Sequence, residues 1–352
     1  MHDSSRWLVR ACAVVQALAA LACSGNRFAD EPAPAAPAMT IAEACDDLAH
    51  ALCNLRVTCT NAVESTGSSL LRVYGDMDTC LSREALQCQN QAKATGSGSN
   101  PAHIERCVSA VADEACADFF DNVPPPACIP GGSRAAGEPC AFNSQCSSGY
   151  CGGTAHAICG SCGTAPGAGG DCTTSNCGRD LICVASTDLC QSRGSEGALC
   201  SSALPCRSDL NCTLMTTTNP TNGATADMMS SCAVAGMAGA ACGTNTSNCD
   251  GMQGLYCGGT KGARTCMGVS YAAAGAACGM LADGTHAMCI AGDCYANGGL
   301  ATGTDAGTCT GFAGDGQPCD AELGPTCLAP ARCVTTNGSK GVCTLPLGAS
   351  CD

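Results

Sequence analysis

The residues whose type and spacing could do chemistry begin with Cys159 and Cys162, which form the one C-x-x-C segment of the sequence. That spacing can form a redox dithiol or supply half of a zinc site. A zinc site of this kind needs a second such pair, and a redox dithiol of the thioredoxin type needs an alternating strand–helix context. The sequence has neither, so we interpret both cysteines as members of a disulfide framework.

Other reactive side chains are sparse. None of the five histidines lies in an H-E-x-x-H segment, and no G-x-S-x-G segment occurs. His50 and His103 fall on predicted helices, where we expect solvated or packed side chains. Asp76 and Asp78 lack the rest of a calcium-binding loop, and Asp78 is better explained as a helix cap. We therefore expect no catalytic residue, no metal and no cofactor, that is, a protein that is not an enzyme.

The cysteine content defines the class of protein. The chain has 352 residues, of which 36 are cysteine and 3% are aromatic. A cysteine share above roughly 8–10% is typical of a disulfide scaffold, which requires export from the reducing cytosol. The formal net charge of −14 repels phosphate backbones, so we expect no nucleic-acid partner.

The N-terminus has the pattern of an export signal. Basic residues in 1–10 precede an apolar run at 11–22, and Ala20-Leu21-Ala22 fits the small-x-small rule for cleavage. Cys23 follows directly. We expect residues 1–22 to be a signal peptide and residues 23–39, rich in Pro and Ala, to be a tether. If Cys23 carries a lipid, an even number of 34 cysteines remains for pairing, which favours lipidation over ordinary cleavage and secretion.

Residues 40–128 predict a helical domain. Thr40 and Glu43 form a capping box, and apolar residues then recur at helical spacing. A second helix is predicted over 78–93, with Asp78 as its N-cap, and a third after Asn100-Pro101. Eight cysteines in this region predict three or four helices joined by four disulfides.

Residues 137–352 predict a repeat array of about six units. The phrase Gly-x-x-Cys occurs seven times, and each interval holds three further cysteines, except the first, which holds four. The glycine of the phrase is expected to adopt a positive φ or a tight turn. The predicted fold class is small and disulfide-rich, with the helical domain followed by an elongated array of short β-ribbons and turns.

The first unit resembles an EGF-type module in its cysteine spacing. The resemblance implies the pairs Cys140–Cys151, Cys146–Cys159 and Cys162–Cys172, after which the remaining cysteines fall into five sets of four. The alternative frame begins each unit at its Gly-x-x-Cys and leaves Cys162 and Cys351 over. Sequence does not decide between the frames, and we prefer the first.

The array is also similar to the N-terminal cysteine pattern of Dickkopf proteins, from Cys140 to Cys183, without their adjacent Cys-Cys pair. The whole layout, including the segment Tyr74-Gly75-Asp76 before Cys80, resembles the cysteine-rich lipoproteins of myxobacteria. That resemblance implies an outer-membrane or extracellular location and no established activity.

These observations predict an exported, non-enzymatic surface protein that is lipid-anchored or secreted and adhesive or protein-binding. Its partner would be an unidentified protein or surface glycan, and its contact with a membrane would be through the lipid alone. The longest loop of the array, residues 213–231, is the candidate contact region, and the alternative is that it is only a tolerated insertion. The alternative is a disulfide-rich inhibitor of secreted hydrolases.

Overall fold

The computed structural model describes residues 38–351. Within that range it leaves out residues 61, 64–65, 154–156, 174–175, 185, 202–203, 219–224, 244–247, 261, 297–298 and 302–304. The predicted signal peptide, Cys23 and nearly all of the predicted tether therefore lie outside the described residues. Residues from Met39 onward form one compact unit, and none of its described helices has the length and apolar character needed to cross a membrane.

The helical region begins where the capping box places it. The Thr40 hydroxyl accepts a hydrogen bond from the Glu43 N–H (3.2 Å), and the Glu43 carboxylate accepts one from the Thr40 N–H (2.8 Å). The helices are α1 (Ile41–Thr58), α2 (Ser68–Val73), α3 (Met77–Lys93), α4 (Pro101–Val111) and α5 (Cys116–Phe120), and the short hairpin β1 (Ala62–Val63) and β2 (Thr66–Gly67) lies between α1 and α2.

The N-cap of α3 differs from the predicted one by two residues. Asp76, not Asp78, has the extended backbone of a cap, and its carboxylate accepts a hydrogen bond from the Thr79 N–H at 2.7 Å. Asp78 lies in the first turn of the helix, where its negative charge interacts favourably with the positive end of the helix dipole. The predicted cap of α4 is confirmed, because the Asn100 side chain accepts from the His103 N–H.

Four disulfides join these helices, as their eight cysteines predict. The core beside them is thin, since Ala44, Cys45, Cys88 and Ile104 make up one of its buried clusters. Small side chains bury little apolar area, so the cross-links supply stability that packing does not. The bonds are Cys45–Cys88, Cys53–Cys80, Cys59–Cys116 and Cys107–Cys128. Cys128 lies in the 3-10 turn η1 (Pro126–Cys128).

The array consists of small sheets, about one to a unit, in which the strands are antiparallel except for the parallel pair of β12 with β14. The fifth unit shares a six-stranded sheet with β12, which precedes it. The strands are β3 (Pro139–Cys140), β4 (Cys151–Gly152), β5 (Gly160–Cys162), β6 (Leu181–Val184), β7 (Leu189–Ser192), β8 (Leu210–Thr218), β9 (Thr225–Val234), β10 (Leu255–Gly258), β11 (Thr265–Gly268), β12 (Ser270–Ala272), β13 (Ala277–Met280), β14 (His286–Cys289), β15 (Gly292–Ala296), β16 (Gly299–Leu300), β17 (Gly307–Gly311), β18 (Pro318–Asp320), β19 (Arg332–Asn337) and β20 (Lys340–Thr344). The short 3-10 turns η2 (Asn143–Gln145) and η3 (Gly348–Cys351) complete the described elements. This is the disulfide-rich fold class that the sequence predicts.

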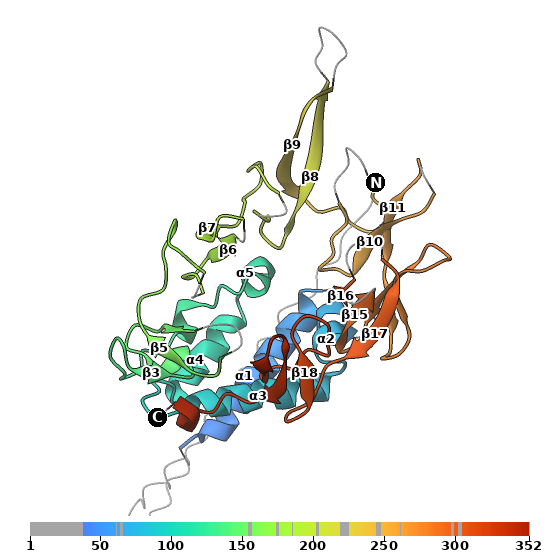
Figure 1. Ribbon diagram of the computed structural model, residues 1–352. Helices are drawn as coiled ribbons and strands as arrows, with labels where there is room; N and C mark the ends of the chain where they lie inside the picture. Colours follow the sequence, from blue (N-terminus) through green and yellow to red (C-terminus); the bar gives the residue numbers. More distant parts are fainter. Residues whose placement is uncertain are drawn as a thin grey trace, which may run out of the picture. The chain divides into compact units, whose positions relative to one another are not determined.

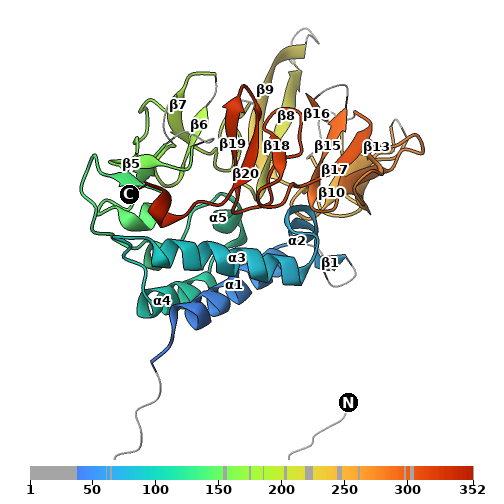
Figure 2. The same cartoon turned by 60° about the horizontal axis from the view of Figure 1, so that its bottom comes forward.

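The units of the array pack against the helices (Figures 1 and 2). Figure 2 shows α1, α3 and α4 on one side, with the strands of the array on the other. The contacts come from units far apart in the sequence: Gln145 with Thr95, Arg207 with Asp118, Ser208 with Asp121, Gln253 with Cys59, Tyr271 with Ser68, Ala291 with Leu71, and Arg83 with Asp315.

The ends of the array meet. A disulfide joins Cys159 of the first unit to Cys351, 192 residues later in the chain. The C-terminal turn η3 contacts both β3 and α3. The expectation of an elongated array is therefore wrong in this respect, because contacts with the helices along its length and a covalent bond between its ends make it a closed ring.

Candidate functional site

Each unit of the array is closed by two reciprocal backbone hydrogen bonds at its Gly-x-x-Cys phrase. In the fourth unit the Gly239 N–H donates to the Cys266 carbonyl, and the Cys266 N–H donates to the Ala240 carbonyl, both at 2.8 Å. The same two bonds recur in the other five units. All six glycines have φ between 75° and 88°, a region that residues with a side chain rarely adopt. The predicted positive φ is thus confirmed in six of the seven phrases.

The seventh phrase has another role. Gly348 is buried, and a Cβ there would collide with Ala94 at the end of α3. The glycine therefore permits a close approach of η3 to the helical region rather than a turn that opens a new unit.

Two crossed disulfides hold each unit. The first cysteine bonds to the third, and the second to the last, as in Cys172–Cys183 and Cys177–Cys190. The third and last cysteines of a unit lie directly opposite each other in a β-hairpin or ladder without bonding to each other, as Cys183 and Cys190 do in β6–β7. The other pairs of this pattern are Cys140–Cys151, Cys146–Cys162, Cys200–Cys212, Cys206–Cys232, Cys242–Cys257, Cys249–Cys266, Cys278–Cys294, Cys289–Cys309, Cys319–Cys333 and Cys327–Cys343.

This pairing corrects the EGF-like expectation for the first unit. Cys140–Cys151 is present, but Cys146 bonds to Cys162 instead of Cys159, and Cys172 bonds to Cys183 within its own unit. The physical reason is register: Cys151 and Cys162 are directly opposed between β4 and β5, as in every other unit. The frame that begins each unit at Gly-x-x-Cys is therefore correct, and the cysteine it leaves over is Cys159, which reaches Cys351.

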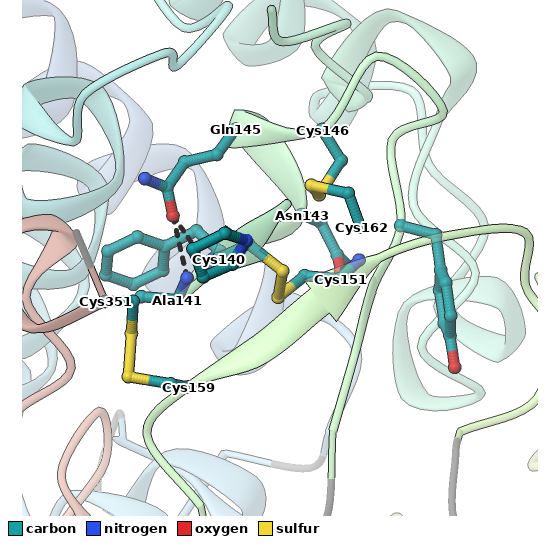
Figure 3. Close-up of a disulfide and its surroundings, with 12 residues drawn as sticks. Cys140, Ala141, Asn143, Gln145, Cys146, Cys151, Cys159, Cys162 and Cys351 are labelled. Carbon is teal, nitrogen blue, oxygen red and sulfur yellow. Dashed lines mark hydrogen bonds between the residues drawn. A yellow bond between two sulfur atoms is a disulfide. The ribbon is translucent and has the colours of Figure 1, made fainter. Parts of the chain in front are cut away.

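The C-x-x-C segment is not a dithiol pair in this structure. Cys159 bonds to Cys351 and Cys162 to Cys146 (Figure 3). Gly160–Cys162 is strand β5, and three residues of extended chain span roughly 10 Å. A disulfide needs Cα atoms within about 7 Å, so the strand keeps Cys159 and Cys162 from bonding to each other.

The clusters of cysteine sulfurs in the units are made of disulfides and not of metal-binding thiolates. In several units three cysteine Sγ atoms lie within 4.8 Å of one another, as those of Cys172, Cys177 and Cys190 do. These sulfurs belong to adjacent crossed disulfides. Metal binding needs thiolates, and all 34 described cysteines, from Cys45 to Cys351, are bonded in the 17 disulfides.

Gln145 fastens the first unit to the helices. Its side chain is fully buried. Its Oε1 accepts from the N–H groups of Ala141 (2.7 Å) and Phe142 (3.1 Å), and its Nε2 donates to the Thr95 carbonyl at 2.8 Å. Figure 3 shows this side chain beside the crossed disulfides. One buried amide thus satisfies three backbone groups, which would otherwise be costly to bury.

Three further polar side chains are those of His50, His103 and Asn211. His50 is exposed on α1, and burial lowers the pKa of His103, with Arg106 adding to the effect. The Asn211 amide donates to the carbonyls of Asn248 and Cys249 and so links the third and fourth units.

Sequence reasoning did not single out a partly buried polar cluster formed by α1, α3 and the C-terminal end of α2. The Tyr74 hydroxyl donates to Glu84 at 2.7 Å, and Glu84 also pairs with Arg56 at 3.5 Å. Burial and the Glu84 charge raise the pKa of Tyr74 far above its usual range. The arrangement holds the hydroxyl protonated as a structural donor.

The segment between the third and last cysteines of each unit varies in length on this constant scaffold. It has six residues in the second unit and nineteen in the third. In the third unit it forms most of the β8–β9 hairpin, here called the arm (residues 210–234), which projects from the body in Figure 1. The arm contains the predicted contact region, residues 213–231, of which residues 219–224 lie outside the described residues.

Exposed apolar side chains lie at the base of the arm. Leu199, Val234 and Met237 are 58%, 59% and 62% exposed. Leu199 is bridged to Ser231 of β9, Val234 ends β9, and Met237 follows three residues later.

Comparisons with family models, with curated proteins and with solved structures give no match for this chain.

Proposed function

We propose that this chain is a non-enzymatic surface protein, anchored by a lipid on Cys23 and binding a protein or a surface glycan through the arm. The disulfide content is that of an exported protein.

Cysteine pairing supports the anchor. The 34 cysteines from Cys45 onward bond among themselves, so the described chain has no cysteine left over for Cys23. A cysteine that directly follows a small-x-small cleavage segment and needs no partner fits a lipidated N-terminus.

The observation that carries the binding proposal is a constant scaffold with one extended hairpin. Six units keep the same crossed disulfides and closing hydrogen bonds, while the arm is longer than any other hairpin segment between the same two cysteines. Variable loops on a rigid framework are where binding residues concentrate. The apolar side chains at its base favour a protein partner.

The anchor is tested by Cys23→Ser in the full-length chain. The parent should partition into detergent and incorporate palmitate, and the variant should do neither, because the thioether-linked lipid has no attachment point. A variant that remains in the membrane fraction and still labels with palmitate would show that the anchor lies elsewhere.

The arm is tested by replacing residues 214–230 with Asn-Gly, which makes a two-residue hairpin turn between the paired residues Thr213 and Ser231. The measurement is binding of the purified, labelled protein to the surface of the producing cells. Binding should fall by at least about tenfold, equivalent to about 1.4 kcal/mol. Shortening the β19–β20 hairpin is the control and should leave binding unchanged.

Unchanged binding of the short-arm variant would overturn the proposal. A captured secreted hydrolase that loses activity in a 1:1 complex would identify the arm as an inhibitory loop.

A further inference from the structure

One disulfide differs from the others in what it connects. Among the described residues, sixteen disulfides join cysteines within the helical domain or within one unit, with sequence separations of 11 to 57 residues. Cys159–Cys351 alone joins two parts of the array, across 192 residues. It is the covalent closure of the ring.

The two cysteines of this bond differ in their exposure to solvent. Cys159 is exposed, whereas Cys351 is only 6% exposed and packs with Ala94, Ala141 and Phe142. A thiolate from solution can therefore reach Cys159, with Cys351 as the leaving group. Exposed disulfides are the ones that exchange most readily.

We propose that Cys159–Cys351 is a thiol–disulfide exchange site, opened by a dithiol reductant before the other sixteen disulfides, and that its opening unlocks η3 from the first unit. The proposal concerns the state of the ring and does not depend on the lipid or on binding by the arm.

The surroundings of the sulfurs explain why this bond should open first. In a unit, each disulfide lies beside a second one, and its hairpin is held by backbone hydrogen bonds. When one such bond is reduced, the neighbouring bond keeps the two sulfurs facing each other, so their effective concentration stays high and the bond re-forms. Cys159 and Cys351 come from segments that are distant in the chain, and their effective concentration falls once the bond is broken.

An arginine of the sixth unit contacts the segment that precedes Cys159. The Arg332 guanidinium donates to the carbonyl of Ala157, two residues before Cys159, at 3.1 Å. This hydrogen bond is a contact between the first and sixth units that does not involve the disulfide.

The exchange balances as two displacements. One thiolate of the reductant attacks Cys159 Sγ, which forms a mixed disulfide and expels the Cys351 thiolate. The second thiol of the reductant loses its proton and attacks the reductant's other sulfur, which is bonded to Cys159 in the mixed disulfide. This attack releases the Cys159 thiolate. The reductant leaves as a cyclic disulfide, having given two electrons to the cysteines, and both cysteine thiolates take up protons.

The test uses the full oxidised chain in buffers of increasing ratio of reduced to oxidised dithiothreitol, followed by alkylation and peptide mass mapping. Cys159 and Cys351 should reach half-labelling at a ratio at least about tenfold lower than any other pair. The matched control is Cys172–Cys183, which also has one exposed cysteine but lies within a unit. Labelling of Cys172 and Cys183 at the same ratio or a lower one would overturn the proposal.

Unlocking is tested separately with the double variant Cys159→Ser, Cys351→Ser. Amide hydrogen exchange at residues 347–351 should be at least about tenfold faster than in the parent, with α1 unchanged. Equal exchange rates at residues 347–351 in the two proteins would show that packing alone holds η3, and the unlocking part of the proposal would be wrong.

Discussion

The glycine of the Gly-x-x-Cys phrase recurs at the start of all six units of the array. Its positive φ directs its own N–H toward the carbonyl of the last cysteine of the unit. At Gly239 nothing lies within 4 Å of the position that a Cβ would take. The requirement for glycine there is therefore one of backbone conformation rather than of space.

This requirement predicts the effect of Gly239→Ala. The variant should lose about 1 kcal/mol of stability, because an L-residue with a side chain disfavours this φ. The measurement is the midpoint of thermal unfolding of the oxidised protein. Gly268→Ala is the control in the same unit, since it too has open space around a Cβ but no positive φ, and it should change the midpoint little. Equal effects of the two substitutions would contradict the conformational explanation.

At the scale of elements, helix α3 is joined to the sixth unit by one arginine. The Arg83 guanidinium donates to both carboxylate oxygens of Asp315, each at 2.8 Å, and also to the carbonyls of Leu328 and Ala329. These hydrogen bonds lower the pKa of the Asp315 carboxyl. Because the pKa is lower in the folded state, the ion pair stabilises the fold above the ordinary value of 3.8, and this contribution is lost as the pH falls through the folded value.

Asp315→Asn isolates that contribution. At neutral pH the variant should be less stable by about 1 kcal/mol, the upper range for partly exposed pairs. The difference should shrink as the pH is lowered below 3.8, because the parent then loses the same charge. Chemical denaturation at several pH values measures it. The control is Asp209→Asn, which removes an exposed pairing with Arg207 at 3.5 Å and should have no measurable effect. A difference that does not vary with pH would contradict the assignment to the ion pair.

Elements with a local signal were predictable from the sequence. The capping box at Thr40 and the Asn100 cap each depend on residues three positions apart, and the positive φ of the phrase depends on one glycine. The error at α3 has the same local character, since Asp76 and Asp78 both suit a cap and only the direction of the chain before Met77 decides between them.

At the scale of the whole molecule, the closure of the array was not predicted. A contact between residues 192 positions apart has no local signal. The number of cysteines carried part of this signal. In the correct frame the first unit has five cysteines instead of four, and the seventh phrase has one cysteine and no unit after it. The two cysteines left over can therefore pair. The EGF-like spacing obscured this pairing, because it assigned Cys159 to Cys146. Which of the two candidates, Cys159 or Cys162, is left over follows from the register of β4 and β5.

The bond between Cys159 and Cys351 makes the intervening polypeptide a macrocycle. An exported protein meets proteases, and hairpins that project from a scaffold are the segments they cut first. A single cut anywhere between these two cysteines produces two fragments that remain joined through sulfur. The nicked molecule keeps its mass apart from one added water, and its C-terminal fragment stays attached to the N-terminal part of the chain. Shedding of a unit therefore needs two cuts, or one cut and one reduction.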